Sequence, residues 1–409
     1  MTVGTFVTVG AGQAAAVAAR TLRRRGFDGR IVLIGDEPHA PYQRPPLSKE
    51  FLSGAESVDS LWLLTERWLA DNDVDIITGT TVARIDKASR TVVLDRGSEV
   101  SADAVLFATG AVPRRLPVAG PRPELVHVLR TIDDARRLQR ALSGARRAVV
   151  IGGGFIGLEI AATATRLGLS VTVLEAGPLP LGAILGPRIA GLCTDLHRRN
   201  GVEVRTSVVV QTLRTTSDTV VVELADGTVL EADLAIVGVG VTPNVSAAAA
   251  SGLAVDGGIV VDGQGRTSIP EVYAAGDVAR RYSARLGRHV RSEHFDNANR
   301  QGAAVADAVL GRDAVADDPG WFWSDQYDHN IQLCGAASNV DPIIRGDVES
   351  MDFAAFYTDG GVLVGAFGID RGEDVMAARE LIGRTIEPGV LADQDVDLWT
   401  LYETEEVAS

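Results

Sequence analysis

The stretch that most limits the possible folds of this chain is residues 149–159, which reads VVIGGGFIGLE. An apolar run typical of a buried parallel strand is followed by Gly152, Gly154 and Gly157 in a G-x-G-x-x-G arrangement. An alanine-rich helical segment comes next, and a second strand ends in Glu175. This order predicts a dinucleotide-binding unit, because the glycines let the backbone approach a pyrophosphate and the carboxylate accepts hydrogen bonds from a ribose.

The beginning of the chain repeats this order. Residues 5–24 read as a strand, a G-x-G-x-x-A turn and a helix, and a second strand follows at residues 31–34. Two neighbouring acids, Asp36 and Glu37, come after that strand, and either one is a candidate for the ribose. The chain is therefore predicted to contain two nucleotide-binding units that hold two nucleotides.

Length and charge narrow the class of protein. A chain of 409 residues is expected to form two or three domains. Its net charge of -15 argues against general nucleic-acid binding. No unbroken apolar run reaches membrane-spanning length, and no basic and apolar leader opens the sequence, so we expect a cytoplasmic protein without a membrane partner.

The two cysteines, Cys193 and Cys334, lie far apart in the sequence and form no C-x-x-C pair. We therefore expect two buried thiols and no redox-active disulfide beside a cofactor. No metal site is predicted.

Three further segments carry specific expectations. The prolines of residues 39–52 (HAPYQRPPLSKEFL) favour a stiff extended turn, in which Arg44 and Lys49 place two cations near the first nucleotide site; by composition alone the same segment also fits a solvated loop. Residues 257–267 are expected to form a pair of strands. Residues 280–291 contain five arginines and no acid, which fits either a positive docking surface or a loop paired with acids elsewhere.

Four strings together resemble one protein family. They are PYQRPPLSK at 41–49, GGGFIGLE at 152–159, TSIPEVYAAGD at 267–277 and WFWSDQY at 321–327. With them the chain resembles the pyridine-nucleotide flavoprotein reductases of the glutathione-reductase fold, and within that group the NADH-dependent ferredoxin reductases that supply oxygenases. Disulfide reductases of this fold carry a cysteine pair on the first long helix, which this chain lacks.

The resemblance implies an α/β fold with two Rossmann-like dinucleotide-binding domains and a C-terminal α+β domain. The implied domains are an FAD-binding domain in two parts, residues 1–112 and 240–320, an NAD-binding domain at residues 113–239, and a C-terminal domain at residues 321–409.

The resemblance also implies residues that contact FAD. Gly10, Gly12 and Ala14 are expected at the pyrophosphate, and Asp36, with Glu37 as its rival, at the adenosine ribose. Val82 is expected beside the adenine, Arg44 and Arg130 opposite phosphate or flavin charge, Asp277 at the ribityl chain and Phe295 against the flavin ring.

NADH is expected on the second unit, at Gly152, Gly154, Gly157 and Glu175. The carboxylate of Glu175 would repel a 2′-phosphate, so NADH is preferred over NADPH. In similar reductases the positions of Lys49 and Glu159 form an ion pair beside the flavin N5 edge. A cation there stabilises the negative charge that builds up when hydride arrives.

The implied electron acceptor is a small acidic 2Fe–2S ferredoxin, and the chain is expected to be a monomer or weak dimer. The expected docking patch consists of Arg280, Arg281, Arg285, Arg288 and Arg291. Alternative functions are an NADH oxidase or rubredoxin reductase of the same fold, or a flavin-carrying redox sensor similar to the apoptosis-inducing flavoproteins.

Overall fold

The computed structural model describes residues 3–313, 317–337 and 340–406. Residues 1–2, at the start of the predicted first domain, and residues 407–409, at the end of the predicted last domain, lie outside the described residues. The chain divides into two compact units, and each is described by itself. The first unit comprises residues 1–44, 57–112 and 241–320, and the second comprises residues 45–56, 113–240 and 321–409.

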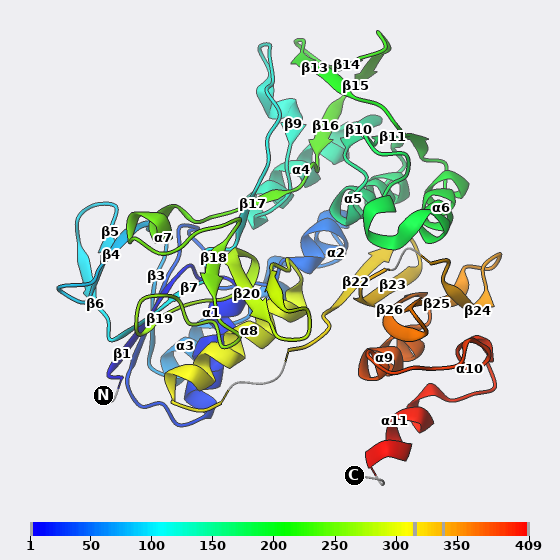
Figure 1. Ribbon diagram of the computed structural model, residues 1–409. Helices are drawn as coiled ribbons and strands as arrows, with labels where there is room; N and C mark the ends of the chain where they lie inside the picture. The colour runs from blue at the N-terminus through cyan, green and yellow to red at the C-terminus, as the bar shows by residue number, and fades with distance from the viewer. Residues whose placement is uncertain (1–2, 314–316, 338–339, 407–409) are drawn as a thin grey trace. The chain divides into compact units, whose positions relative to one another are not determined.

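The first unit contains a parallel sheet with strand order β19-β7-β1-β2-β3. Four of these strands, β1, β3, β7 and β19, are labelled in Figure 1. Its strands are β1 (Thr5–Val9), β2 (Arg30–Ile34), β3 (Val74–Ile77), β7 (Ala104–Phe107) and β19 (Val272–Ala274). Helices α1 (Gln13–Arg24) and α8 (Phe295–Val309) pack closely, because a Cβ atom added at Gly302 would lie 2.4 Å from the carbonyl oxygen of Ala14. The predicted strand, glycine turn and helix at the start of the chain are therefore present.

Two smaller sheets complete the first unit. One is β4 (Val82–Asp86), β5 (Thr91–Leu94) and β6 (Glu99–Ser101), and the other is β18 (Ile259–Val261), β20 (Ala279–Ser283) and β21 (Arg288–Val290). The short helices are α3 (Glu66–Asp71), α7 (Ser246–Ala250), η2 (Val58–Leu61) and η4 (Gly276–Val278). The expected pair of strands within residues 257–267 is wrong, since β18 pairs in parallel with the more distant β20.

The second unit contains another parallel sheet, with strand order β12-β11-β10-β16-β9. Its strands are β9 (Val126–His127), β10 (Arg147–Ile151), β11 (Ser170–Leu174), β12 (Glu203–Arg205) and β16 (Leu234–Val237). Its helices are α4 (Ile132–Gly144), α5 (Phe155–Arg166) and α6 (Gly182–Arg199). Thr131 and Asp134 form a capping box that starts α4.

Further short elements surround this sheet. They are η3 (Pro123–Leu125) and an antiparallel sheet of β13 (Val210–Thr215), β14 (Val220–Leu224) and β15 (Val229–Ala232). The strands β8 (Ala111–Pro113) and β17 (Val241–Pro243) pair with each other.

The proline-rich segment is divided between the units, because residues 39–44 belong to the first unit and residues 45–52 to the second. The part in the second unit is not extended as expected. It forms a 3-10 turn, η1 (Pro45–Ser48), followed by α2 (Glu50–Ser53). Proline is compatible with a first helical turn, where its missing N–H would have no intrahelical partner. The prolines therefore begin a turn here.

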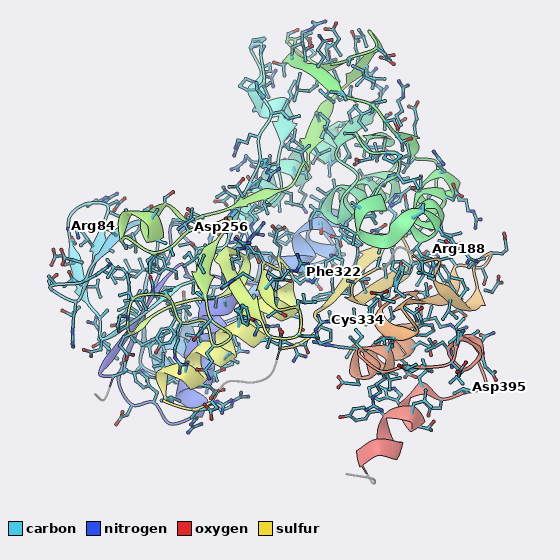
Figure 2. The ribbon with its side chains drawn as sticks, in the orientation of Figure 1. Arg84, Arg188, Asp256, Phe322, Cys334 and Asp395 are labelled. Atoms are coloured by element: carbon cyan, nitrogen blue, oxygen red, sulfur yellow. The ribbon has the colours of Figure 1, made fainter. Side chains whose placement is uncertain are left out.

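The C-terminal residues form an antiparallel sheet with strand order β22-β23-β26-β25-β24. Its elements are β22 (Trp321–Gln326), β23 (His329–Gly335), β24 (Ile343–Asp347), β25 (Asp352–Asp359), β26 (Val362–Ile369), α9 (Gly372–Leu381), α10 (Pro388–Ala392) and α11 (Leu398–Glu406). Phe353 and Phe367 share one buried apolar cluster with Ile189 and Cys193 of α6, whereas Cys334, labelled in Figure 2, is buried in a cluster with residues of α9. The predicted α/β fold with two dinucleotide-binding units and a C-terminal α+β domain is confirmed.

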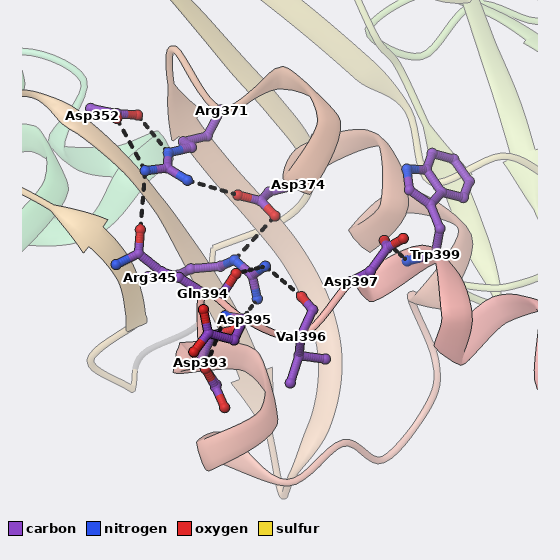
Figure 3. A network of polar contacts seen from close by, with 10 residues as sticks. All are labelled: Arg345, Asp352, Arg371, Asp374, Asp393, Gln394, Asp395, Val396, Asp397 and Trp399. Atoms are coloured by element: carbon purple, nitrogen blue, oxygen red, sulfur yellow. Dashed lines mark hydrogen bonds and ion pairs between the residues drawn. The ribbon is translucent and has the colours of Figure 1, made fainter.

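One arginine fixes the segment between α10 and α11 (Figure 3). The Arg345 side chain is only 6% exposed, and its Nε lies 3.1 Å from a carboxylate oxygen of Asp374. Its terminal nitrogens donate to the backbone carbonyls of Asp393 and Val396, each at 2.6 Å. The segment between α10 and α11 is therefore bound to strand β24 through polar contacts as well as apolar packing.

Candidate functional site: two glycine turns and a buried lysine–glutamate pair

The glycine turn of the first unit leaves the start of α1 open. Gly10 has φ +104°, and a Cβ atom there would lie 2.3 Å from the carbonyl oxygen of Ala108, so the tight turn requires glycine. Gly12 is the N-cap of α1 and makes no side-chain cap, and no atom lies within 4 Å of the position its Cβ would take. The first free N–H groups of α1 are therefore accessible to an anion such as the FAD pyrophosphate.

The second unit has the same arrangement. A Cβ atom at Gly152 would lie 2.3 Å from the carbonyl oxygen of Gly238, and one at Gly157 would lie 2.2 Å from that of Gly152. At Gly154, the N-cap of α5, nothing lies within 4 Å. The first and third glycines are thus required by the fold, whereas the middle glycine faces open space, which fits a bound nucleotide.

Glu175 lies beside this second turn. One of its carboxylate oxygens accepts a hydrogen bond from the backbone N–H of Gly153 at 2.7 Å, and the other accepts one from that of Gly177 at 2.6 Å. A carboxylate has about four acceptor positions. Glu175 is therefore oriented by the backbone and keeps acceptor capacity for a ribose.

The two candidate acids after β2 differ in their surroundings. Asp36 is exposed. Glu37 is half-buried and accepts hydrogen bonds from the Tyr42 hydroxyl at 2.5 Å and the Arg44 guanidinium at 2.7 Å. Burial alone would lower the pKa of Arg44, but Tyr42, Glu37 and Asp277 raise it above its usual value, so the guanidinium is charged.

The other residues expected at FAD are divided between the units. In the first unit Ala14 and Val82 are buried, Asp277 lies in η4 near Arg44, and Phe295 begins α8. Arg130 lies in the second unit, directly before the cap of α4, where its backbone N–H donates to Asp134 at 3.1 Å. Whether these residues contact FAD stays a prediction.

The structure brings Lys49 and Glu159 together inside the second unit. The Lys49 Nζ lies 2.9 Å from a carboxylate oxygen of Glu159, and their side chains are 9% and 1% exposed. Lys49 also donates to the carbonyl of Pro45 at 3.1 Å. Two hydroxyls complete the site. The Ser48 hydroxyl donates to Glu159 at 2.5 Å, and the Ser324 hydroxyl also donates to Glu159, at 2.6 Å. The buried charges are thus paired and hydrogen-bonded.

Several residues of these sites were not identified from the sequence. Ser48 and Ser324 lie inside the PPLSK and WFWSDQY strings, so those strings carried a signal that was not assigned to them. Tyr42 lies in the PYQRPP string in the same way. Nothing in the sequence marked His197, which bonds to Gln326 and Tyr327.

The five arginines of residues 280–291 lie on and around the β20–β21 hairpin. Carboxylates outside residues 280–291 pair with three of them: Asp256 with Arg280, Asp317 with Arg281 at 3.1 Å, and Glu293, two residues further along, with Arg291 at 2.5 Å. Among the described residues, no carboxylate forms an ion pair with Arg285 or Arg288, and both side chains are exposed. Tyr282 and Leu286 beside them are 42% and 44% exposed.

The described residues contain neither a membrane-spanning helix nor a cluster of metal ligands. No helix in this part of the chain is both long enough and apolar enough to cross a membrane. Within the same residues, no group of three or more histidine, cysteine, aspartate or glutamate side chains is arranged to hold a metal ion.

Comparison with known proteins covers almost the whole chain. The family model described as pyridine nucleotide-disulphide oxidoreductase matches residues 4–302, and the model described as reductase C-terminal matches residues 321–402. The chain is 38% identical over 378 residues to the 3-phenylpropionate/cinnamic acid dioxygenase ferredoxin–NAD(+) reductase component of Photorhabdus laumondii subsp. laumondii, covering 92% of this chain and 96% of that protein.

Two solved structures are also similar. The ferredoxin reductase for the CYP199A2 system from Rhodopseudomonas palustris superimposes with a TM-score of 0.92 at 38% identity, covering 98% of this chain and 100% of that chain. The covalent putidaredoxin reductase–putidaredoxin complex superimposes with a TM-score of 0.94 at 35% identity, covering 98% of this chain and 99% of that chain.

Proposed function

We infer, because this chain belongs to the pyridine nucleotide-disulphide oxidoreductase family, that it is an FAD-dependent NADH:ferredoxin reductase of an oxygenase system. The observation that carries this proposal is the pair of glycine turns in which Gly12 and Gly154 face open space at a helix start. FAD, when bound, supplies the chemistry that accepts hydride and releases electrons singly. Relatives named as ferredoxin–NAD(+) reductases support the same function.

The residues of this chain bind and orient the two nucleotides. The open helix starts at Gly12 and Gly154 bind the pyrophosphates of FAD and NADH, and Glu175 binds the NADH ribose and disfavours a 2′-phosphate. Lys49, charged and oriented by Glu159, supplies positive charge that stabilises the reduced flavin. The remaining FAD contacts proposed from the sequence are Gly10, Ala14, Asp36 or Glu37, Arg44, Val82, Arg130, Asp277 and Phe295.

The proposed ferredoxin docking patch is narrower than the sequence suggests. Since Arg280, Arg281 and Arg291 are paired within the chain, Arg285 and Arg288 are the cations available to an acidic partner. Exposed apolar side chains beside them suit the centre of a protein interface. The hairpin therefore offers both charge for steering and apolar area for contact.

The proposed activity is tested by the visible spectrum and by acceptor dependence. Purified protein is expected to show bands of oxidised flavin that NADH bleaches. With NADH present, cytochrome c reduction is expected to depend on an added 2Fe–2S ferredoxin. A correctly folded protein that cannot be reconstituted with FAD would refute the proposal, and equal cytochrome c reduction without ferredoxin would refute the ferredoxin step.

The docking patch is tested by charge reversal. Arg285→Glu/Arg288→Glu is expected to raise the apparent KM for ferredoxin about tenfold or more and to leave ferricyanide reduction unchanged. The matched control is Arg188→Glu/Arg214→Glu, which makes the same change of net charge at exposed arginines of the second unit. Equal effects of the two double variants on ferredoxin would contradict a specific patch.

We further propose a cytoplasmic location, because the buried thiols of Cys193 and Cys334 suit a reducing compartment. We propose a monomer or weak dimer in solution, which analytical ultracentrifugation tests directly.

A further inference from the structure

A line of buried hydrogen bonds leads away from the Lys49–Glu159 pair inside the second unit. The Ser324 hydroxyl oxygen, which bonds to Glu159, also lies 3.0 Å from the Gln326 Nε2. The Gln326 Oε1 lies 2.8 Å from the Nε2 of His197, and the Nδ1 of His197 lies 2.9 Å from the Tyr327 hydroxyl. Three segments, β22, the turn after it and the last turns of α6, therefore contribute to one polar chain.

The donor and acceptor of every hydrogen bond in this series follow from the Glu159 carboxylate at its start. The carboxylate of Glu159 is paired with Lys49 and only accepts, so the Ser324 hydroxyl must donate to it. The oxygen of Ser324 then accepts from the Gln326 amide nitrogen, which turns the amide oxygen of Gln326 toward His197. An amide oxygen only accepts, so the proton of a neutral His197 must lie on Nε2.

The last hydrogen bond of the series, between Tyr327 and His197, also has its donor directed toward Glu159. With its proton on Nε2, His197 has an unprotonated Nδ1, which accepts from the hydroxyl of Tyr327. All four donors therefore point toward Glu159. Hydrogen bonds that are aligned in this way polarise one another and strengthen the bond at the charged end.

We propose that His197 is a positioning residue for the Lys49–Glu159 pair: as the neutral tautomer protonated on Nε2, it orients Gln326 and Ser324 so that the Ser324 hydroxyl fixes the Glu159 carboxylate against Lys49. Its influence on hydride transfer rests on the proposed function above, whereas its tautomer does not.

Burial of His197, Ser324 and Gln326 supports this assignment. His197 and Ser324 are 0% exposed and Gln326 is 1% exposed, so water does not compete for their hydrogen bonds. Burial lowers the pKa of His197 to about 4, against the opposing effect of the bond to Gln326, and the ring is therefore neutral at pH 7. Burial also raises the pKa of Tyr327, which keeps its hydroxyl protonated and able to donate.

The tautomer is tested by 15N NMR of protein labelled at its six histidines. The signals lost in His197→Phe are assigned to His197, and His197→Gln serves for assignment if the phenylalanine variant does not fold. At neutral pH we expect one protonated and one unprotonated ring nitrogen, with the proton on Nε2. A proton on Nδ1, or on both nitrogens, would overturn the proposal.

The positioning role is tested by stopped-flow reduction of the bound flavin with NADH. His197→Phe and Gln326→Leu are each expected to slow reduction about tenfold, and the double variant is expected to be no slower than either single one, because both act through Ser324. The control is Thr194→Val, which removes a buried hydroxyl of α6 that, among the described residues, donates to the carbonyl of Ala190 in its own helix at 2.8 Å.

These outcomes separate the two proposals. Wild-type reduction rates in both His197→Phe and Gln326→Leu, or an additive slowing in the double variant, would overturn the positioning role. A wild-type protein whose bound flavin is not reduced by NADH would instead overturn the proposed function, and the NMR result would still decide the tautomer.

Discussion

Replacement of Gly154 or Gly157 by alanine is predicted to change two different properties, nucleotide affinity for Gly154 and stability of the fold for Gly157. Gly154 has φ −79° and ψ 173°, which any residue adopts, and its Cβ atom would enter open space. At Gly157 the Cβ atom would lie 2.2 Å from the carbonyl oxygen of Gly152. The first substitution should therefore affect a bound nucleotide, and the second should affect the fold.

The expected magnitudes follow from these distances. Gly157→Ala forces α5 away from the turn, which costs about 1–3 kcal/mol as overpacking, and the better helix propensity of alanine returns about 1 kcal/mol. Gly154→Ala changes only an N-cap residue and should lower the free energy of unfolding by less than about 1 kcal/mol. Loss of one charge-assisted hydrogen bond to a phosphate costs about 2 kcal/mol, or about 30-fold in the Kd for NADH.

The assay measures both quantities on both variants. Equilibrium titration of the oxidised protein with a non-reducing NADH analogue gives Kd, and thermal unfolding at fixed FAD content gives stability. We expect weaker binding with near wild-type stability for Gly154→Ala and lower stability for Gly157→Ala. Wild-type affinity in Gly154→Ala would refute the assignment of this turn to the nucleotide.

Three further predictions concern single groups. Lys49→Ala should keep FAD bound but slow flavin reduction by about 100-fold, and a wild-type reduction rate and flavin potential would contradict its role. Because Glu175 repels a 2′-phosphate, kcat/KM should be about 100-fold higher with NADH than with NADPH, and an NADPH preference in steady-state assays would disprove this. Burial lowers the pKa of both His127 and His197 to about 4 from 6.5, so the unfolded chain binds more protons between these values. The free energy of unfolding should fall as pH decreases from about 6.5 to about 4, and His127→Gln should show a shallower fall in melting temperature; a pH-independent melting temperature would contradict this.

The elements that were predicted from the sequence are those whose signals are local. The strand, glycine turn and helix around Gly10 and Gly152 are encoded within a few residues of each other, because tight turns demand glycine at fixed spacings. The fold followed from these elements together with the family strings.

One wrong expectation and two contacts that the sequence did not reveal depend on partners distant in the sequence. Strand β18 pairs with β20, with Ile259 opposite Ala279, so the expectation of a strand pair within residues 257–267 was wrong. Arg281 is neutralised by Asp317, 36 positions away, which no local charge count reveals. His197 meets Gln326 across 129 positions, and a single histidine in a helix carries no sign of such a contact.

The role of Arg345 has a consequence for how this protein can change. Its guanidinium is satisfied by carbonyl groups that belong to the last part of the chain. A shortened chain that ended before Asp393 would remove these carbonyl partners and leave the buried charge paired with Asp374 alone among the described residues. Residues from Asp393 onward can therefore be removed without leaving a buried charge only if Arg345 is replaced as well. These last residues are an integral part of the C-terminal domain.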